Sequence, residues 1–336
     1  MRQSKAVTLQ DVARVAGVSV QTASQILAKT KGVKFAPATV ARVQQAAEEV
    51  GYKPNRLAQA MKRGRTHVIG VWVSLNRPVI SYLHFLNLLS QKAAGSGYDL
   101  QITALTNEMA YLGEGSLPTT WPVDAVIAID AGKALRLFRE DRTNDDIPVL
   151  VMGLEEYANA DSVVWNLVAG SELAVRNMIQ SGAQKIIYVV PSWVNHGFPN
   201  EKRRRGYDTI MEEFGLEPAY VLCDDETVVS AANALRGYIE THGRPDGVYA
   251  FHEIIALGSA VALAEHPQGN ETRIWGLSVT THETWSPIPI STIEIPVKEV
   301  IDEVWRLLLD RIENPHQEHR HVEIPMVTVE RDQFSS

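Results

Sequence analysis

Three polar residues near the N-terminus, Thr8, Asp11 and Ser19, have the spacing of helix caps. The side-chain oxygen of a Thr or Ser before a helix accepts a hydrogen bond from a backbone N–H that lacks a partner, and an acidic residue three positions later strengthens the signal. Gly17 is expected to end the first helix, because glycine permits the backbone to reverse. Two short helices joined by such a turn form a helix-turn-helix, whose second helix reads the major groove of DNA. An ordinary helical hairpin is the alternative.

The charge distribution favours the first interpretation. Residues 1–65 hold 12 Lys and Arg against 3 Asp and Glu, a net charge of +9. Residues 66–336 hold 20 against 37, a net charge of −17, and the whole-chain charge of −8 hides this contrast. Positive charge confined to one segment is typical of phosphate binding, and the acidic remainder repels phosphates.

Length and composition limit the remaining possibilities. With 336 residues and 45% hydrophobic side chains, the chain can fill the cores of two or three domains. It has no apolar run long enough for a membrane span, and residues 1–5 do not begin a signal peptide, so we expect a cytoplasmic protein. A single cysteine, Cys223, excludes internal disulfides and cysteine-rich zinc sites. We expect no metal and no cofactor.

The hydrophobic pattern places further elements along the chain. A third helix follows Pro37, and residues 55–64 form a short basic helix. From residue 67, short apolar strands alternate with amphipathic helices, and the pattern starts again near residue 170. This alternation predicts an α/β fold with two doubly wound parallel sheets and a ligand cleft at the carboxyl ends of their strands. Residues 322–329 are predicted to form one final strand.

Two motifs connect these residues to a known family. The pattern Thr-Leu-x-Asp-Val-Ala-x-x-Ala-Gly-Val-Ser-x-x-Thr-x-Ser spans residues 8–24, and Gly-Tyr-x-Pro-Asn follows at 51–55. Together they resemble the lactose-repressor (LacI/GalR) family. The resemblance implies a homodimeric transcriptional repressor that binds a pseudo-palindromic operator in double-stranded DNA and is controlled by a small molecule.

The resemblance also implies a domain organisation. An all-helical helix-turn-helix headpiece covers 1–54, a hinge helix and linker cover 55–66, and an effector-binding and dimerisation body covers 67–336. The body is expected to be two-lobed and similar to periplasmic binding proteins. Its N-lobe is about 67–164 plus 296–321, and its C-lobe is about 165–295 plus 322–333.

Residue roles on DNA follow from the same resemblance. Val20 and Gln21 are expected to touch base edges, while Gln25 replaces an Arg found in many members and therefore favours adenine over guanine. Met61 is expected to wedge between bases in the minor groove, beside Lys62. Other DNA-binding positions, which contact phosphates or allow close approach, are Thr8, Ser19, Thr22, Ser24, Asn55 and Ala58.

The expected effector pocket departs from the family pattern. Arg203 occupies the position that commonly binds a sugar hydroxyl or a carboxylate, and its guanidinium suits either. His252, Ser278 and Trp165 replace other residues that the family commonly uses, so the usual sugar does not carry over. We expect a polar effector, a sugar or sugar derivative, also lined by Asn76, Tyr82 or Trp193. Trp165 and Trp193 have an alternative role as core or rim aromatics.

The sequence contains nothing that resembles a catalytic set, so we expect no enzyme. His316, His319 and His321 lack acidic or cysteine partners at metal-ligand spacing and are expected to lie in a solvated loop. An enzyme with a helical accessory domain and a transport binding protein are less favoured alternatives. A family member that answers to a protein partner instead of a small molecule is the third.

Overall fold

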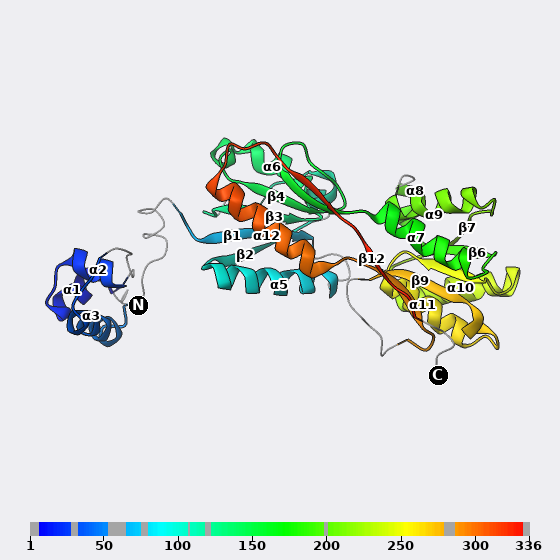
Figure 1. Cartoon of the computed structure of the whole chain (residues 1–336), viewed down its shortest axis with the longest axis horizontal. Coiled ribbons are helices and arrows are strands. Elements are labelled where there is room, and N and C mark those ends of the chain that lie inside the picture. The colour runs from blue at the N-terminus through cyan, green and yellow to red at the C-terminus, as the bar shows by residue number, and fades with distance from the viewer. Residues whose placement is uncertain are drawn as a thin grey trace. The chain divides into compact units, whose positions relative to one another are not determined.

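The structure is a computed structural model that describes residues 7–27, 33–52, 65–74, 80–106, 108–117, 122–197, 201–278 and 286–331. The chain divides into two compact units, Met1–Thr66 and His67–Ser336. The first unit is helical, and the second consists of two α/β lobes (Figure 1). The predicted hinge helix at 55–64 lies outside the described residues.

The described residues of the N-terminal unit form three helices, α1 (Leu9–Ala16), α2 (Val20–Leu27) and α3 (Pro37–Glu49). The Asp11 carboxylate accepts hydrogen bonds from the backbone N–H of Thr8 at 3.0 Å and from its hydroxyl at 2.8 Å. Gly17 ends α1 with a φ of 62°, in the left-handed region that glycine tolerates. Small side chains fill the core between the helices, so the helices approach closely: Val12, Ala13, Ala16, Ala23, Ile26, Val43, Ala46 and Ala47.

The first lobe of the second unit is built on one parallel sheet of order β11-β5-β4-β3-β1-β2. Its strands are β1 (Val68–Ser74), β2 (Asp99–Leu105), β3 (Ala125–Ile129), β4 (Val149–Gly153), β5 (Asp161–Trp165) and β11 (His321–Ile324). Helices α5 (Ile80–Ser96) and α12 (Val297–Glu313) lie side by side along this sheet (Figure 1). The smaller helical segments are α6 (Ala134–Glu140), η1 (Glu108–Leu112) and η2 (Arg142–Asn144).

The second lobe repeats the design with a sheet of order β12-β10-β9-β8-β6-β7, in which only the β10–β12 pair is antiparallel. Its strands are β6 (Ile186–Pro191), β7 (Ala219–Cys223), β8 (Gly247–Ala250), β9 (Arg273–Ser278), β10 (Ile290–Glu294) and β12 (Val327–Val329). Its helices are α7 (Leu167–Gln180), α8 (Ser192–Gly197), α9 (Lys202–Glu213), α10 (Val228–His242), α11 (Glu253–Ala264) and the short η3 (Gly269–Glu271). The predicted fold class is confirmed.

Three short connections join the lobes. The chain passes from β5 to α7 through Asn166, from β10 to α12 through residues 295–296, and from β11 to β12 through residues 325–326. The prediction of one strand over 322–329 is wrong. Pro325 has no backbone N–H to donate to a sheet, so the segment splits into two strands that belong to different sheets. The first lobe therefore keeps the chain through Ile324, beyond the expected boundary at 321.

Candidate functional site

The start of α2 presents polar side chains on the surface of the N-terminal unit. The Ser19 hydroxyl accepts a hydrogen bond from the Thr22 backbone N–H at 3.0 Å and is 2.8 Å from the Thr22 hydroxyl. Val20 is 43% exposed, and Gln21 is exposed beside it. Because Ala23 and Ile26 hold the opposite face in the core, these two side chains are available to a groove of DNA.

The predicted DNA-binding residues differ in their exposure to solvent. Thr8 and Ser19 are exposed, whereas Thr22, Ser24 and Gln25 are half-buried on α2. Asn55, Ala58, Met61 and Lys62 lie outside the described residues, and their roles stay predictions. Arg42, for which the sequence indicated no role, donates from Nε to the Ala16 carbonyl at 2.9 Å. A cation at the last turn of a helix is favourable, so Arg42 fixes α3 against the end of α1.

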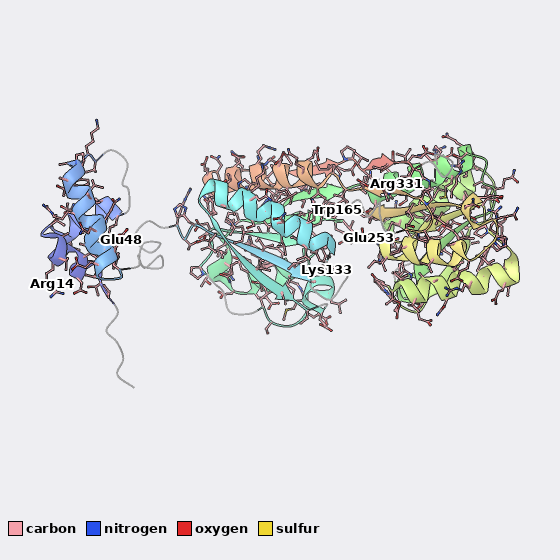
Figure 2. All side chains as sticks on the ribbon, turned by 90° about the horizontal axis from the view of Figure 1, so that it is seen from below. Arg14, Glu48, Lys133, Trp165, Glu253 and Arg331 are labelled. Carbon is pink, nitrogen blue, oxygen red and sulfur yellow. The ribbon has the colours of Figure 1, made fainter. Side chains whose placement is uncertain are left out.

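A cavity of about 130 Å³ lies between the two lobes of the second unit, where the strands of both sheets end. Trp165 at the end of β5 lines it from the first lobe and stacks on Phe85 of α5, with ring centroids 5.8 Å apart. Figure 2 shows Trp165 beside Glu253 of the second lobe, which also lines the cavity. The carboxyl ends of parallel strands are the usual place for a ligand in such folds.

Arg203 lines the cavity from the first turn of α9 and is 7% exposed. Its Nε donates to the Glu201 carboxylate at 2.6 Å, and its Nη1 donates to the Phe251 carbonyl at 3.1 Å. The guanidinium carbon lies 3.5 Å from the centre of the Phe251 ring. Burial alone would lower the pKa of Arg203, but the Glu201 carboxylate raises that pKa above its ordinary value, so the side chain stays cationic.

His252 is held in one tautomer. Its Nδ1 accepts a hydrogen bond from the Ile254 backbone N–H at 3.2 Å and thereby caps α11. Nδ1 must carry a lone pair for this bond, so Nε2 carries the hydrogen and donates to the Glu226 carboxylate at 2.8 Å. Through these two bonds, the imidazole links the end of β8 to the acidic segment after β7.

Two further pairs of polar side chains line the cavity. The Ser278 hydroxyl donates to the Glu253 carboxylate at 3.0 Å, and the Tyr82 hydroxyl donates to Asp130 at 3.3 Å. Asp130 follows β3 and has a φ of 47°, which is unusual for a residue other than glycine. Backbone strain of this kind gathers at ligand sites, where surrounding structure holds a side chain in place.

The cavity brings together Arg203, His252, Ser278, Trp165 and Tyr82 of the predicted effector residues. Trp193 does not line it: the side chain lies on α8 with its ring edge-on to Phe251, 6.4 Å between centroids. Asn76 lies outside the described residues. The sequence did not indicate the polar and aromatic lining residues Phe85, Asp130, Glu226, Phe251 and Glu253, or the aliphatic residues that also line the cavity. Asp130 follows directly after an apolar strand, which was a usable signal.

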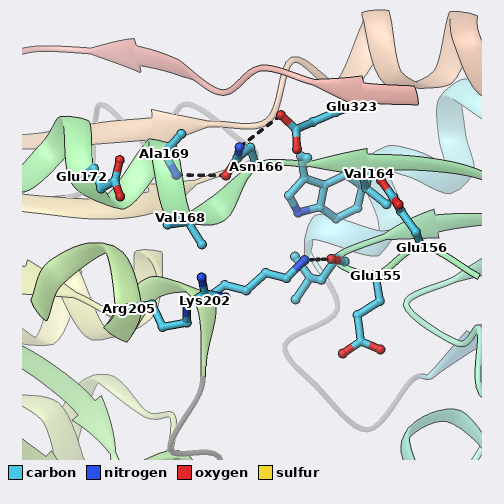
Figure 3. Close-up of a pocket in the computed structure, with 12 residues that line it drawn as sticks. Glu155, Glu156, Val164, Asn166, Val168, Ala169, Glu172, Lys202, Arg205 and Glu323 are labelled. Carbon is cyan, nitrogen blue, oxygen red and sulfur yellow. Dashed lines mark hydrogen bonds between the residues drawn. The ribbon is translucent and has the colours of Figure 1, made fainter. Parts of the chain in front are cut away.

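A second and larger cavity, of about 710 Å³, lies beside the connection at Asn166 (Figure 3). The Asn166 side chain accepts from the Ala169 backbone N–H at 2.9 Å and donates to Glu323 at 3.0 Å. Lys202 of α9 donates to the Leu154 carbonyl after β4, so it connects the two lobes. The remaining polar lining is mixed in charge and comes from Glu155, Glu156, Glu172 and Arg205.

Other kinds of site are not evident in the part of the chain that the structure describes. No three His, Cys, Asp or Glu side chains there are placed to hold a metal ion. None of the described helices is both long enough and apolar enough to cross a membrane.

Two family models match the chain. Residues 8–55 match bacterial regulatory proteins of the lacI family, and residues 175–332 match the periplasmic binding protein-like domain. The HTH-type transcriptional repressor PurR of Aliivibrio salmonicida is 26% identical over 337 residues, which cover 96% of this chain and 98% of that protein. PurR of Serratia proteamaculans is 25% identical and covers 96% of both.

Solved structures show the same fold. The lac repressor dimer bound to operator and the anti-inducer ONPF aligns with a TM-score of 0.79 at 19% identity, covering 99% of this chain and 100% of that one. A complex of the transcriptional regulator CelR with cellobiose aligns with a TM-score of 0.64 at 20% identity, covering 97% and 99%.

Proposed function

The chain belongs to the LacI family of bacterial regulatory proteins, and from this premise we propose that it is a homodimeric repressor controlled by a small polar effector. The effector, a sugar or sugar derivative, would bind in the cavity between the lobes. The headpieces of two copies would bind the half-sites of a pseudo-palindromic operator, since a two-fold dimer matches a two-fold DNA site. The role of the cavity is binding without turnover.

The lining of the cavity supports the proposal that it binds an effector. Side chains that can hydrogen-bond, from both lobes, converge on one cavity at the carboxyl ends of both sheets, beside the aromatic rings of Trp165 and Phe85. Aromatic walls with a few fixed polar groups are typical of small-molecule sites.

The coupling to DNA follows from the connections between the lobes. A ligand that contacts both lobes binds one arrangement of them better than another and shifts the population towards it. If the headpieces bind the operator better in one of these arrangements, the effector changes operator affinity and the operator changes effector affinity by the same factor.

A variant at Gln21 tests the DNA-binding part. Gln21→Ala is expected to weaken binding to DNA selected from a random library by about 1–3 kcal/mol and to relax base preference at one position of each half-site, because a bidentate amide contact is lost. Competition binding at fixed salt concentration measures both effects. Gln44→Ala, an exposed glutamine on α3, serves as the control and should bind as the wild type does. Unchanged affinity and preference in Gln21→Ala would contradict the assignment of α2 as the recognition helix.

A thermal-shift screen against sugars, sugar derivatives and nucleosides tests the effector part. A ligand at a hundred times its dissociation constant stabilises the folded state by about 2.7 kcal/mol, which corresponds to an increase in Tm of about 5 °C or more. Arg203→Met should abolish the response, whereas Trp193→Phe, outside the cavity, should keep it. An Arg203→Met variant that responds like the wild type would contradict the site. If no compound in the screen stabilises the protein while DNA binding is intact, the proposal of a small effector fails and regulation by a protein partner is favoured.

A further inference from the structure

Glu201 is the centre of a hydrogen-bond cluster around Arg203, which lines the cavity. It is the N-cap of α9, and its carboxylate accepts from the Arg204 backbone N–H at 3.0 Å, from Arg203 Nε at 2.6 Å and from the Tyr188 hydroxyl at 3.4 Å. The Arg203 and Glu201 side chains are 8% and 11% exposed. The ion pair is therefore nearly enclosed by protein.

The ion pair changes what Arg203 offers to a ligand. An isolated guanidinium attracts anions strongly, and in a partly dehydrated cavity this attraction is larger than in water. A carboxylate 2.6 Å from Nε repels an anion that approaches the guanidinium and so offsets part of this attraction.

The same contacts fix the direction of the hydrogen-bond donor. Nε is committed to Glu201, Nη1 to the Phe251 carbonyl, and the guanidinium plane is held against the Phe251 ring. Among the contacts of the described residues, Nη2 of Arg203 has no hydrogen-bond partner. Since Arg203 lines the cavity, Nη2 is the donor left for a molecule there, and the Glu201 carboxylate offsets part of the charge behind this donor.

Among the described residues that line the cavity, the charged side chains besides Arg203 are the carboxylates Asp130, Glu226 and Glu253. Each is engaged by a hydroxyl or an imidazole, and none would attract an anion. These carboxylates, Asp130 from the first lobe and Glu226 and Glu253 from the second, favour ligand groups that donate hydrogen bonds, as sugar hydroxyls do.

We infer that Glu201 sets the class of effector: by neutralising and aiming Arg203, it makes the cavity accept an uncharged, hydroxyl-rich molecule and reject sugar acids and sugar phosphates. This inference rests on the proposed function of the cavity as the effector site. Glu201 is a positioning residue, because it acts on the ligand through Arg203.

The test is a gain of anion binding, with inorganic phosphate as the probe. Glu201→Gln keeps an acceptor for the Arg204 N–H and the size of the side chain, and it leaves the Arg203 charge without its counter-ion. We expect this variant to bind phosphate about tenfold or more tightly than the wild type, by calorimetry at constant ionic strength, because a hydrogen bond to an unneutralised charged group contributes at least that factor. Adding Arg203→Met to Glu201→Gln should remove the gain.

The matched control is Glu213→Gln. Glu213 forms a bidentate ion pair with Arg176 on the surface, with both distances at 2.7 Å, so the substitution frees an arginine outside any cavity. It should gain no phosphate binding. An equal gain in both variants, or no gain in a folded Glu201→Gln protein, would overturn the inference.

The wild-type protein gives an independent measurement. Sugar phosphates or sugar acids that raise its Tm as much as uncharged sugars do would also overturn the inference, whether or not the variant folds. If the wild type responds to no small molecule while Glu201→Gln gains phosphate binding through Arg203, the effector proposal fails but the neutralising role of Glu201 stands.

Discussion

Replacing Arg311 with Met is expected to lower the free energy of unfolding by about 3–5 kcal/mol, because it removes the cation that pairs with both oxygens of the buried Asp161 carboxylate and leaves the more distant Arg320, whose Nη2 is 3.9 Å away. Asp161 begins β5 and is 1% exposed, and both of its oxygens accept from Arg311 of α12 at 2.8 Å. Arg311 also donates to the carbonyls of Pro315, Gln317 and Glu318. It therefore holds the turn that leads to β11.

Denaturant unfolding of Arg311→Met measures this loss. The control is Arg306→Met, one turn earlier on α12, which removes an exposed ion pair with Glu303 and should cost less than about 1 kcal/mol. A similar loss in both variants would contradict a special role for the buried pair.

The effect should depend on pH in a defined direction. Burial alone would raise the pKa of Asp161, but the hydrogen bonds and charges of Arg311 and Arg320 hold it below the ordinary 3.8. A depressed carboxyl pKa stabilises the fold above the unfolded value, and this contribution is lost as pH falls through the folded value. The difference between the wild type and Arg311→Met should therefore shrink as pH falls below about 3.8.

The second large loss of stability is expected when a single methyl group is added at Gly206 or Gly258. A Cβ at Gly206 of α9 would lie 2.5 Å from the Val168 carbonyl oxygen of α7, and one at Gly258 of α11 would lie 2.5 Å from the Val228 carbonyl oxygen of α10. These obstacles are backbone atoms, which cannot rotate away. Gly206→Ala and Gly258→Ala should each lower the free energy of unfolding by about 1–3 kcal/mol or more, because the helices must separate.

A third glycine provides the control. Gly237 lies within α10, and a Cβ there would meet no atom within 4 Å. Gly237→Ala should raise the free energy of unfolding by about 0.5–1 kcal/mol, since alanine loses less backbone entropy in a helix. If Gly206→Ala were as stable as Gly237→Ala, this result would contradict the close packing of α9 against α7.

The elements that could be predicted best from the sequence are those that depend on residues close together in the chain. The caps at Thr8 and Ser19 and the turn at Gly17 depend on contacts within a few residues, and the structure confirms these elements. Strands β5 and β10 are not evident from the apolar pattern, because buried Asp161, Ser162, Ser291 and Thr292 interrupt the apolar runs by which buried strands are recognised.

The effector cavity could be predicted only in part, because it is formed by contacts between residues that are distant in sequence. The pairing of His252 with Glu226 joins residues 26 apart, and that of Tyr82 with Asp130 joins residues 48 apart. No spacing rule predicts either contact. Glu201 and Arg203 are neighbours in sequence, yet their ion pair depends on the first turn of α9, where side chains two positions apart do not usually face each other.

The crossing between β11 and β12 has a consequence for synthesis of the protein. Both strands come after every other described strand in sequence, and each forms the outer edge of a different sheet, beside β5 and β10 respectively. A ribosome that stops before residue 321 releases a chain in which the buried strands β5 and β10 become edge strands in place of the largely exposed β11 and β12. Newly bared edge strands pair readily with other chains, so one premature stop exposes two starting points for aggregation in the same molecule.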